Sequence, residues 1–565
     1  MRLFRFPALF SVVRIALPLT MAALLSACGG SGGGDDGGGP SQPPATVTVS
    51  GKITFDRVPF KTAGAGLNPA APVESPARQV VVEAVDDAGA ILATTTTDTA
   101  GDYTFQVPSN RSLKIRAKAQ MQKTGTAPTW NFRVLNNTNS DALYALEDSA
   151  SSTGTANSTR NLRAATGWGT TGYTGTRAAA PFAILDSVYR AKELILTAAA
   201  GTAFPDLNLY WSETNRTGTS TSALCPDTGD VGTSFYIGAG FSDECTPSGS
   251  LPAGIYILGS FSNGAGDTDE FDQHVISHEF GHYIEDKFSR SDSIGGTHGS
   301  PDRLDLRVAF GEGWGNAYSA MVLADPVYRD SSAGIASESN FNLENDNTAV
   351  EGWFSEFSVG EILWDLFDTV ADAGDQVSLG FPPIFTVLTG TQKDTDALTS
   401  IFSFADALRT ANGAQTAGID ALLGGESISG INAFGDNEGN AGGSSTALPI
   451  YQNPASQMIV CSSGGDDSRN KLGYRRFLRL NVTSASAVTI TATGAVDTAN
   501  PGSVAATDPD IYVYRRGAVV AFSEATGPSE TISQQPLAAG LHIIEVYDFD
   551  LGAAPRCMSV SISGI

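Results

Sequence analysis

Two histidines and a glutamate within one helical turn are the residues of this chain best suited to chemistry. The segment His278-Glu279-Phe280-Gly281-His282 places two imidazoles four residues apart, and this spacing puts them on one face of a helix. Both rings can then bind one zinc ion, while Glu279 can take a proton from a water at the metal. The pattern predicts metal-assisted amide hydrolysis with Glu279 as general base. Two surface histidines one turn apart are the alternative.

A catalytic zinc site needs a third protein ligand if water is to take the fourth position. Glu312 lies in the segment Phe310-Gly311-Glu312-Gly313-Trp314, which begins a second helix-like stretch. The chain between His282 and Glu312 is long enough for a loop and a return helix. We therefore expect Glu312 to be the third ligand, with a solvated glutamate as the alternative.

The two motifs together resemble a known family. HEFGH followed by GEGW is similar to the gluzincin metallopeptidases, and most of all to the fungalysin family. The resemblance covers residues 271–368, where residues 360–364 resemble a core helix of the family. It implies a zincin fold, zinc bound by His278, His282 and Glu312, and hydrolysis of peptide bonds with Glu279 as base. Asn316 stands where such enzymes commonly have an aspartate, and we expect it to orient a ligating imidazole.

Further candidates surround the motif. Tyr283 and His298 are candidate partners of the oxyanion, although Tyr283 is also expected in the core and His298 in an exposed loop. His274, one turn before His278, is expected to be a solvated helix residue. The strand at residues 254–258 could be the sheet edge on which an extended peptide lies.

The elements that carry these residues predict a multidomain protein. Residues 166–455 form the catalytic domain, where a helix-like run at 178–199 and short apolar strands predict an α+β zincin fold. Residues 46–135 alternate as strands and resemble a carboxypeptidase regulatory-like β-sandwich. Residues 136–165 lack periodicity and are expected to be a loose linker. Residues 456–565 resemble a pre-peptidase C-terminal β-sandwich.

The first 45 residues predict export and anchoring. Residues 1–27 combine arginines with an apolar run, as a signal peptide does, and Ser26-Ala27-Cys28 resembles a lipoprotein cleavage site. The resemblance implies lipidation of Cys28 and, because Gly29 follows, the outer membrane of a Gram-negative cell, facing the periplasm or the surface. Residues 28–45 are a Gly/Pro-rich tether. An ordinary signal peptide or a transmembrane anchor is the alternative.

The remaining cysteines fit an oxidising compartment. Cys225 with Cys245 and Cys461 with Cys557 are the preferred disulfides because each pair falls within one predicted domain, although four cysteines allow three pairings.

Composition restricts the partners. The 60 acidic residues outnumber the 34 Lys and Arg, giving a net charge of −26, which disfavours nucleic acid. Acidic turns at 436–438, 508–510 and 548–550 could bind Ca²⁺, although solvated turns are the alternative. The sequence does not indicate an oligomeric state.

These features predict a zinc endopeptidase, tethered to the membrane through Cys28, that acts on extracellular or periplasmic protein or peptide substrates. Two other functions are open. One is a noncatalytic adhesion or scaffold lipoprotein with a vestigial metal site, and the other is a zinc hydrolase acting on an amide outside proteins. An intact Glu279 argues against the scaffold, because a structural zinc site needs no general base.

Overall fold

Alternating apolar residues build the amino-terminal strands. In the computed structural model, β1 (Thr46–Arg57) pairs with β2 (Val73–Pro76), β5 (Asp102–Pro108), β11 (Ser158–Thr159) and β12 (Leu162–Ala164). Val47, Val49 and Ile53 of β1 are buried, as their two-residue period requires. The structure describes residues 45–218, 224–238, 245, 249–261, 266–345, 350–369, 377–465, 468–550 and 552–565.

A ten-stranded sheet joins this region to the centre of the molecule. Its main path runs β14 (Phe235–Ile237), β15 (Gly254–Ile257), β13 (Leu207–Trp211), β7 (Trp130–Asn136), β6 (Ser112–Lys123), β3 (Val80–Asp86) and β4 (Ile91–Thr96). Strand β7 is antiparallel to β6 and parallel to β13, so the expected border near residue 136 lies inside one sheet.

Residues 136–165 are more ordered than the expected loose linker. They contain β8 (Ala142–Leu143), β9 (Ala145–Glu147) and β10 (Ser151–Ser152), which join the ten-stranded sheet, and also β11 and β12. Such short strands are held by backbone hydrogen bonds to longer neighbours, and they therefore leave little hydrophobic periodicity in the sequence.

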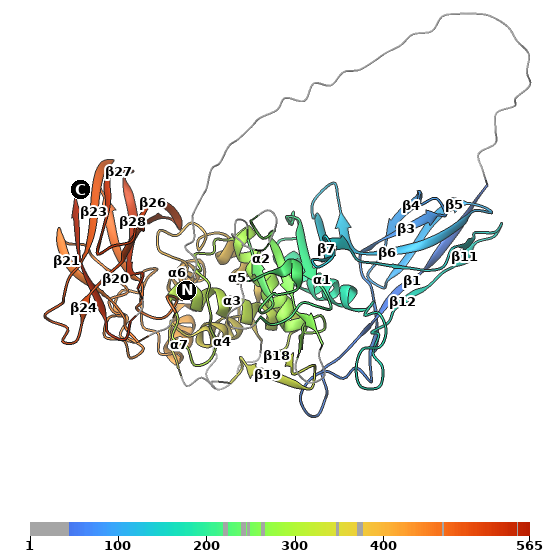
Figure 1. Ribbon diagram of the computed structural model, residues 1–565, viewed down its shortest axis with the longest axis horizontal. Helices are drawn as coiled ribbons and strands as arrows, with labels where there is room; N and C mark the ends of the chain where they lie inside the picture. The colour runs from blue at the N-terminus through green and yellow to red at the C-terminus, as the bar shows by residue number, and fades with distance from the viewer. Residues whose placement is uncertain are drawn as a thin grey trace, which may run out of the picture.

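The helices gather in the centre, between the amino-terminal strands in blue and the carboxy-terminal strands in orange and red (Figure 1). Two hairpins, β16 (Gly259–Ser260) with β17 (Asp267–Thr268) and β18 (Val327–Ser332) with β19 (Ser337–Asn342), accompany them. The helices are α1 (Ala180–Ala198), α2 (Gln273–Phe288), α3 (Leu306–Leu323), α4 (Glu356–Phe367), α5 (Phe381–Thr389), α6 (Ile401–Ala411) and α7 (Thr416–Gly425).

The carboxy-terminal region is a β-sandwich around its own core. One sheet contains β20 (Tyr451–Gln452), β22 (Arg476–Val482), β28 (Gly540–Asp548), β25 (Pro509–Arg515) and β26 (Ala518–Ser523). The other contains β21 (Gln457–Ser462), β29 (Arg556–Ser563), β23 (Ser486–Gly494), β27 (Ser529–Leu537) and β24 (Val504–Ala505). Val488, Ile490 and Ile544 are among the residues that fill the space between them. The multidomain fold class, with β-rich flanks and a helical central region, is thus confirmed.

Both expected disulfides are present. Cys225 is bonded to Cys245, and Cys461 on β21 is bonded to Cys557 on β29. Disulfides are typical of exported proteins. Within the described residues, no helix is both long enough and apolar enough to cross a membrane. The expected signal peptide, Cys28 and nearly all of the tether lie outside the described residues.

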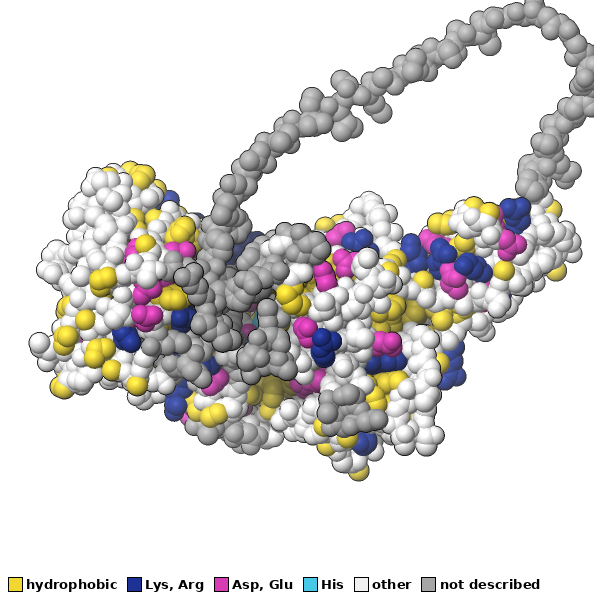
Figure 2. Space-filling model, viewed as in Figure 1, with side chains coloured by type: hydrophobic (Ala, Val, Ile, Leu, Met, Phe, Trp, Pro, Cys, Tyr) yellow, Lys and Arg dark blue, Asp and Glu magenta, His cyan; other side chains and the backbone are white. Residues whose placement is uncertain are grey.

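Charged side chains are sparse on the face drawn in Figure 2. Lys and Arg occur there in small groups beside Asp and Glu rather than in one basic patch.

Candidate metal centre

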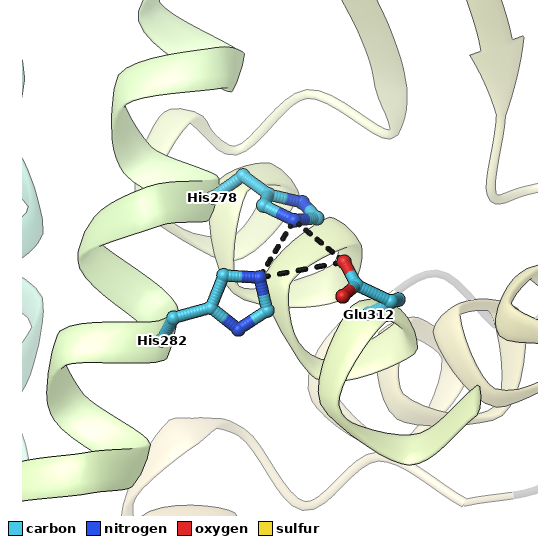
Figure 3. A group of neighbouring side chains, drawn as sticks. All are labelled: His278, His282 and Glu312. Carbon is cyan, nitrogen blue, oxygen red and sulfur yellow. Dashed lines mark hydrogen bonds and ion pairs between the residues drawn. The ribbon is translucent and has the colours of Figure 1, made fainter. Parts of the chain in front are cut away.

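Three side chains from two helices converge on one point. His278 and His282 project from adjacent turns of α2, and Glu312 projects toward them from α3 (Figure 3). The two Nε2 atoms lie 3.0 Å apart, and Glu312 Oε2 is 3.2 Å from His278 Nε2 and 3.4 Å from His282 Nε2. The structure thus brings together all three residues that the spacing predicted as ligands.

The chemistry of this group fits a cation. Two imidazole nitrogens 3.0 Å apart repel each other through their lone pairs unless a proton or a cation lies between them. Burial lowers the pKa of His282, but the charge of Glu312 outweighs burial and raises that pKa to about 9. The same histidines hold the pKa of the buried Glu312 well below its usual range. Two nitrogens and a carboxylate oxygen are the donor set of a catalytic zinc site.

Glycines let the helices approach this closely. A Cβ on Gly315 would lie 2.7 Å from the His278 ring, and a Cβ on Gly313 would lie 2.5 Å from Val359 on α4. Trp314, between the two glycines, is fully buried and donates from Nε1 to the carbonyl oxygen of Gly281 on α2 over 2.9 Å. The GEGWG segment therefore sets the spacing of α2, α3 and α4 as well as supplying Glu312.

The side chain of Asn316 is hydrogen-bonded to His278. Its Oδ1 lies 3.0 Å from His278 Nδ1, so Nδ1 carries the proton and donates to the amide oxygen. The unprotonated Nε2 then faces His282 and Glu312, which is the tautomer that a metal requires.

Glu279 lies on α2 between the two histidines and is 8% exposed. Its Oε2 accepts a hydrogen bond of 2.7 Å from the backbone N–H of Tyr236 on β14. Burial raises the pKa of Glu279, and the neighbouring histidines offset only part of that rise. A carboxylate with a raised pKa is suited to accept and release a proton.

His298, from the loop before α3, also lies at the site. Its Nε2 is 3.4 Å from Glu312 Oε2, and its Nδ1 is 2.9 Å from Oε2 of Glu356 on α4. Burial lowers the pKa of His298, but the bond to Glu356 and the charge of Glu312 raise it to about 9. Glu356 is a site residue that the motifs did not indicate, because it is brought here by the packing of α4 on α3.

Of two neighbouring side chains, Tyr283 takes the core position that was expected as the alternative to an oxyanion partner, whereas the expectation for His274 is wrong. Tyr283 is fully buried and its hydroxyl donates to the carbonyl oxygen of Pro205, so it does not face His278, His282 and Glu312. His274 is buried rather than solvated, with Nδ1 3.3 Å from Ser319 Oγ, and burial lowers its pKa to about 4. Both residues lie on faces of α2 that neighbouring elements cover.

A cavity of about 1240 Å³ opens over His278, His282 and Glu312. Strand β14, the β18–β19 hairpin and α4 supply much of its wall. Its lining includes His278, Glu279, His282, His298, Glu312, Asn316, Tyr236, Tyr328, Phe341 and Glu356.

The sheet edge beside this cavity is β14 rather than the expected strand at residues 254–258. Strand β15 lies between β13 and β14, and within the described residues β14 ends the sheet. The N–H of Tyr236 points to Glu279, so the side of β14 away from β15 faces that glutamate. Chain order did not reveal this, because the edge strand precedes its neighbour in sequence.

In the acidic turns expected as calcium candidates, the carboxylates accept hydrogen bonds from nearby backbone N–H groups or pair with an arginine. Asp548 accepts from the backbone N–H groups of Thr507 and Asp508, and Asp508 accepts from that of Gly527. Glu438 accepts from the N–H groups of Ser429, Gly430 and Asn440, while Asp436 pairs with Arg479.

Comparisons with known proteins cover only part of the chain. No protein-family model matches it, and no curated protein matches it. Among solved structures, the pre-peptidase C-terminal domain of a collagenase from Bacillus anthracis is 16% identical, covering 20% of this chain and 91% of that one with a TM-score of 0.15. A periplasmic inhibitor of g-type lysozyme from Aeromonas hydrophila is also 16% identical, covering 20% and 95% with a TM-score of 0.14.

Proposed function

We propose that this protein is a zinc-dependent endopeptidase of the gluzincin type, similar to the fungalysin family. The observation that carries the proposal is the convergence of His278, His282 and Glu312 beside the buried Glu279, at the wall of a large cavity. His278, His282 and Glu312 would hold the metal. A bound zinc ion would supply Lewis acidity, lowering the pKa of a water and polarising a carbonyl.

Glu279 performs the proton transfers in this proposal. Its carboxylate accepts a proton from the attacking water and then delivers it to the leaving amine. The hydrogen bond from Tyr236 N–H fixes one carboxylate oxygen, Oε2, and leaves Oε1 to face the water. His298, whose pKa is raised by the bond to Glu356 and the charge of Glu312, can donate a hydrogen bond to the developing oxyanion.

An extended peptide fits the free edge of β14. Backbone hydrogen bonds along a strand hold a peptide in register whatever its side chains, which suits an enzyme that cleaves within many proteins. Because β14 also donates to Glu279, a peptide paired with this strand would lie with its backbone next to the general base.

The proposed location is the outer membrane of a Gram-negative bacterium, with a lipid at Cys28 and a tether over residues 28–45. The two disulfides support an oxidising compartment on the periplasmic or outer side. Substrates would then be periplasmic or extracellular proteins.

The test compares casein hydrolysis by residues 29–565, produced in an oxidising compartment, with hydrolysis by the Glu279→Gln variant at equal bound zinc. We expect the variant and the chelator-treated wild type to lose activity by at least about a hundredfold. Glu524→Gln, in the carboxy-terminal sandwich, is the control for a lost carboxylate. Zinc bound in both proteins without hydrolysis by either would favour a noncatalytic scaffold, and failure to bind zinc would contradict the ligand assignment.

A further inference from the structure

A second group of acidic side chains lies in the wall of the same cavity, apart from the histidines. Asp267 and Asp269 come from β17 and the turn that follows it, and Asp330 comes from β18. Carboxylate oxygens of these three residues lie within 4.8 Å of one another. Asp272, the residue that precedes α2, lies close by, because its Oδ2 accepts a 2.7 Å bond from the N–H of Ser331 next to Asp330.

These carboxylates have shielded oxygens that no protein group satisfies. Asp269 is 3% exposed and Asp272 is fully buried, while Asp267 and Asp330 are half-buried. Among the described residues, the Oδ1 atoms of Asp267, Asp269, Asp272 and Asp330 have no hydrogen-bond partner although each is shielded from solvent. Burying a carboxylate oxygen without a partner costs several kcal/mol in general, so a group of four such oxygens calls for a ligand.

The neighbourhood supplies no compensating positive charge. In the described part of the chain, no Lys, Arg or His forms an ion pair with Asp267, Asp269, Asp272 or Asp330. Burial and mutual repulsion raise the pKa of Asp269 and Asp272 well above the usual range, and burial together with Asp267 raises that of Asp330 to about 7. The protein alone therefore leaves these carboxylates electrostatically unfavourable.

We propose that Asp267, Asp269 and Asp330 bind a calcium ion, with Asp272 adding negative charge beside it. The donors are all carboxylate oxygens, which hard cations such as Ca²⁺ prefer, whereas zinc and copper sites usually include at least one imidazole or thiolate. Oxygens within 4.8 Å of one another can share a single ion at the Ca–O distances of about 2.3 to 2.6 Å found in proteins.

The ion would join two elements of the catalytic region. Asp267 and Asp269 lead directly into α2, which carries His278 and His282, while Asp330 belongs to the β18–β19 hairpin at the cavity wall. A calcium ion between them would fix the start of α2 against the hairpin. We expect calcium to stabilise the folded protein, whether or not it hydrolyses peptides.

The test uses the full exported chain, residues 29–565, carrying Glu279→Gln to prevent self-digestion. After removal of metals and addition of stoichiometric zinc, CaCl₂ is titrated while direct binding and Tm are measured. We expect one Ca²⁺ bound per chain and a rise in Tm of at least about 2 °C at saturation, with millimolar MgCl₂ giving neither.

Matched variants locate the site. Asp269→Asn and Asp330→Asn should weaken Ca²⁺ binding by at least about tenfold, because carboxylate count sets affinity, and should also raise the Tm without calcium, because they remove repulsion. Asp436→Asn, in an acidic turn elsewhere, should leave the calcium response unchanged.

Three results would overturn the proposal. The first is that the parent protein does not bind calcium. The second is that Asp269→Asn and Asp330→Asn bind calcium as tightly as the parent. The third is that the parent binds Arg- or Lys-containing peptides, that these variants lose this binding, and that calcium has no effect on it. The last result would identify the carboxylates as a subsite for basic substrate side chains. None of these readouts requires peptidase activity, so the calcium site and the proposed function can fail separately.

Discussion

A single hydrogen bond fixes which nitrogen of His278 faces the proposed zinc. The acceptor is the amide oxygen of Asn316, a weaker acceptor than a carboxylate would be. We predict that Asn316→Leu weakens zinc binding by about 10- to 100-fold and that Asn316→Asp binds zinc at least as tightly as the wild type. Competition with a zinc chelator at pH 7 measures both affinities, with Asn481→Ala, at the exposed position of β22, as control. Unchanged zinc affinity in Asn316→Leu would show that the bond does not orient the ligand.

His298 is the second residue whose role can be isolated. We predict that His298→Ala lowers kcat by about 10- to 1000-fold, because a donor to the oxyanion is lost, with little change in zinc content. His298→Gln should recover part of the rate, since its amide can still donate a hydrogen bond. Steady-state kinetics and metal analysis on the same preparations test this. Loss of zinc in His298→Ala would instead assign His298 to the metal, together with Glu312 and Glu356.

At the scale of elements, the contact between α2 and α3 depends on the absence of a side chain at one position. A Cβ at residue 315 would meet the His278 ring at 2.7 Å, so Gly315→Ala should displace that ring and weaken zinc binding by at least about tenfold. Gly424→Ala on α7 is a matched control, because nothing lies within 4 Å of its added Cβ. The control should keep its zinc and be as stable as the wild type or slightly more stable. Equal zinc binding by both variants would contradict this packing argument.

The free edge of β14 leads to a prediction about substrates rather than variants. A model peptide methylated at one backbone nitrogen near the cleaved bond loses a strand hydrogen bond but keeps every side chain. We expect kcat/KM to fall by about tenfold or more when the methylated nitrogen is one that pairs with β14. Methylation of the backbone nitrogen of the adjacent peptide residue, which points away from β14, should change kcat/KM little. If methylation lowers kcat/KM equally at every backbone position of the peptide, the result would argue against strand pairing.

At the scale of the molecule, a buried ion-pair network joins the helical central region to the carboxy-terminal sandwich. Arg307 on α3 donates to Asp305 and, over 2.8 Å, to Glu545 on β28, which also pairs with Arg475. Arg307 and Glu545 are buried, so removing one partner leaves an uncompensated charge. We predict that Glu545→Gln lowers the free energy of unfolding by about 3–5 kcal/mol. Arg516→Gln breaks an exposed pair with Asp396 and should leave the free energy of unfolding nearly unchanged, because water and salt screen such a pair.

The same network makes the molecule sensitive to acid. Burial raises the pKa of Glu545, but the two arginines outweigh it and hold that pKa below its usual value. The stabilisation is therefore present above the unfolded pKa of about 4.3 and is lost as the pH falls through the lower folded pKa. Unfolding followed between pH 7 and pH 3 should show a smaller acid destabilisation for Glu545→Gln than for the wild type. If the free energy of unfolding falls equally with pH in the wild type and in Glu545→Gln, Glu545 is not a source of acid sensitivity.

The parts of the site that could be predicted are those set by local geometry. The four-residue spacing of His278 and His282 fixes their common helical face, and the alternation of Val47, Val49 and Ile53 fixes the buried face of β1. Glu312 was predicted through its motif. The burial of His274 was not predicted, because the periodicity of α2 does not say which neighbour covers each face.

Sequence alone determined the helix that carries the two imidazoles, the strand pattern of both flanks and the preferred pairing of four cysteines, because each depends on short-range periodicity or on counting. Tertiary structure decided that β14 is the edge of the described sheet and that His298 and Glu356 lie beside Glu312. It also decided that the carboxylates of Asp267, Asp269 and Asp330 lie close together. These relations join elements far apart in the chain. They depend on how sheets and helices pack against one another, which no local pattern of residues specifies.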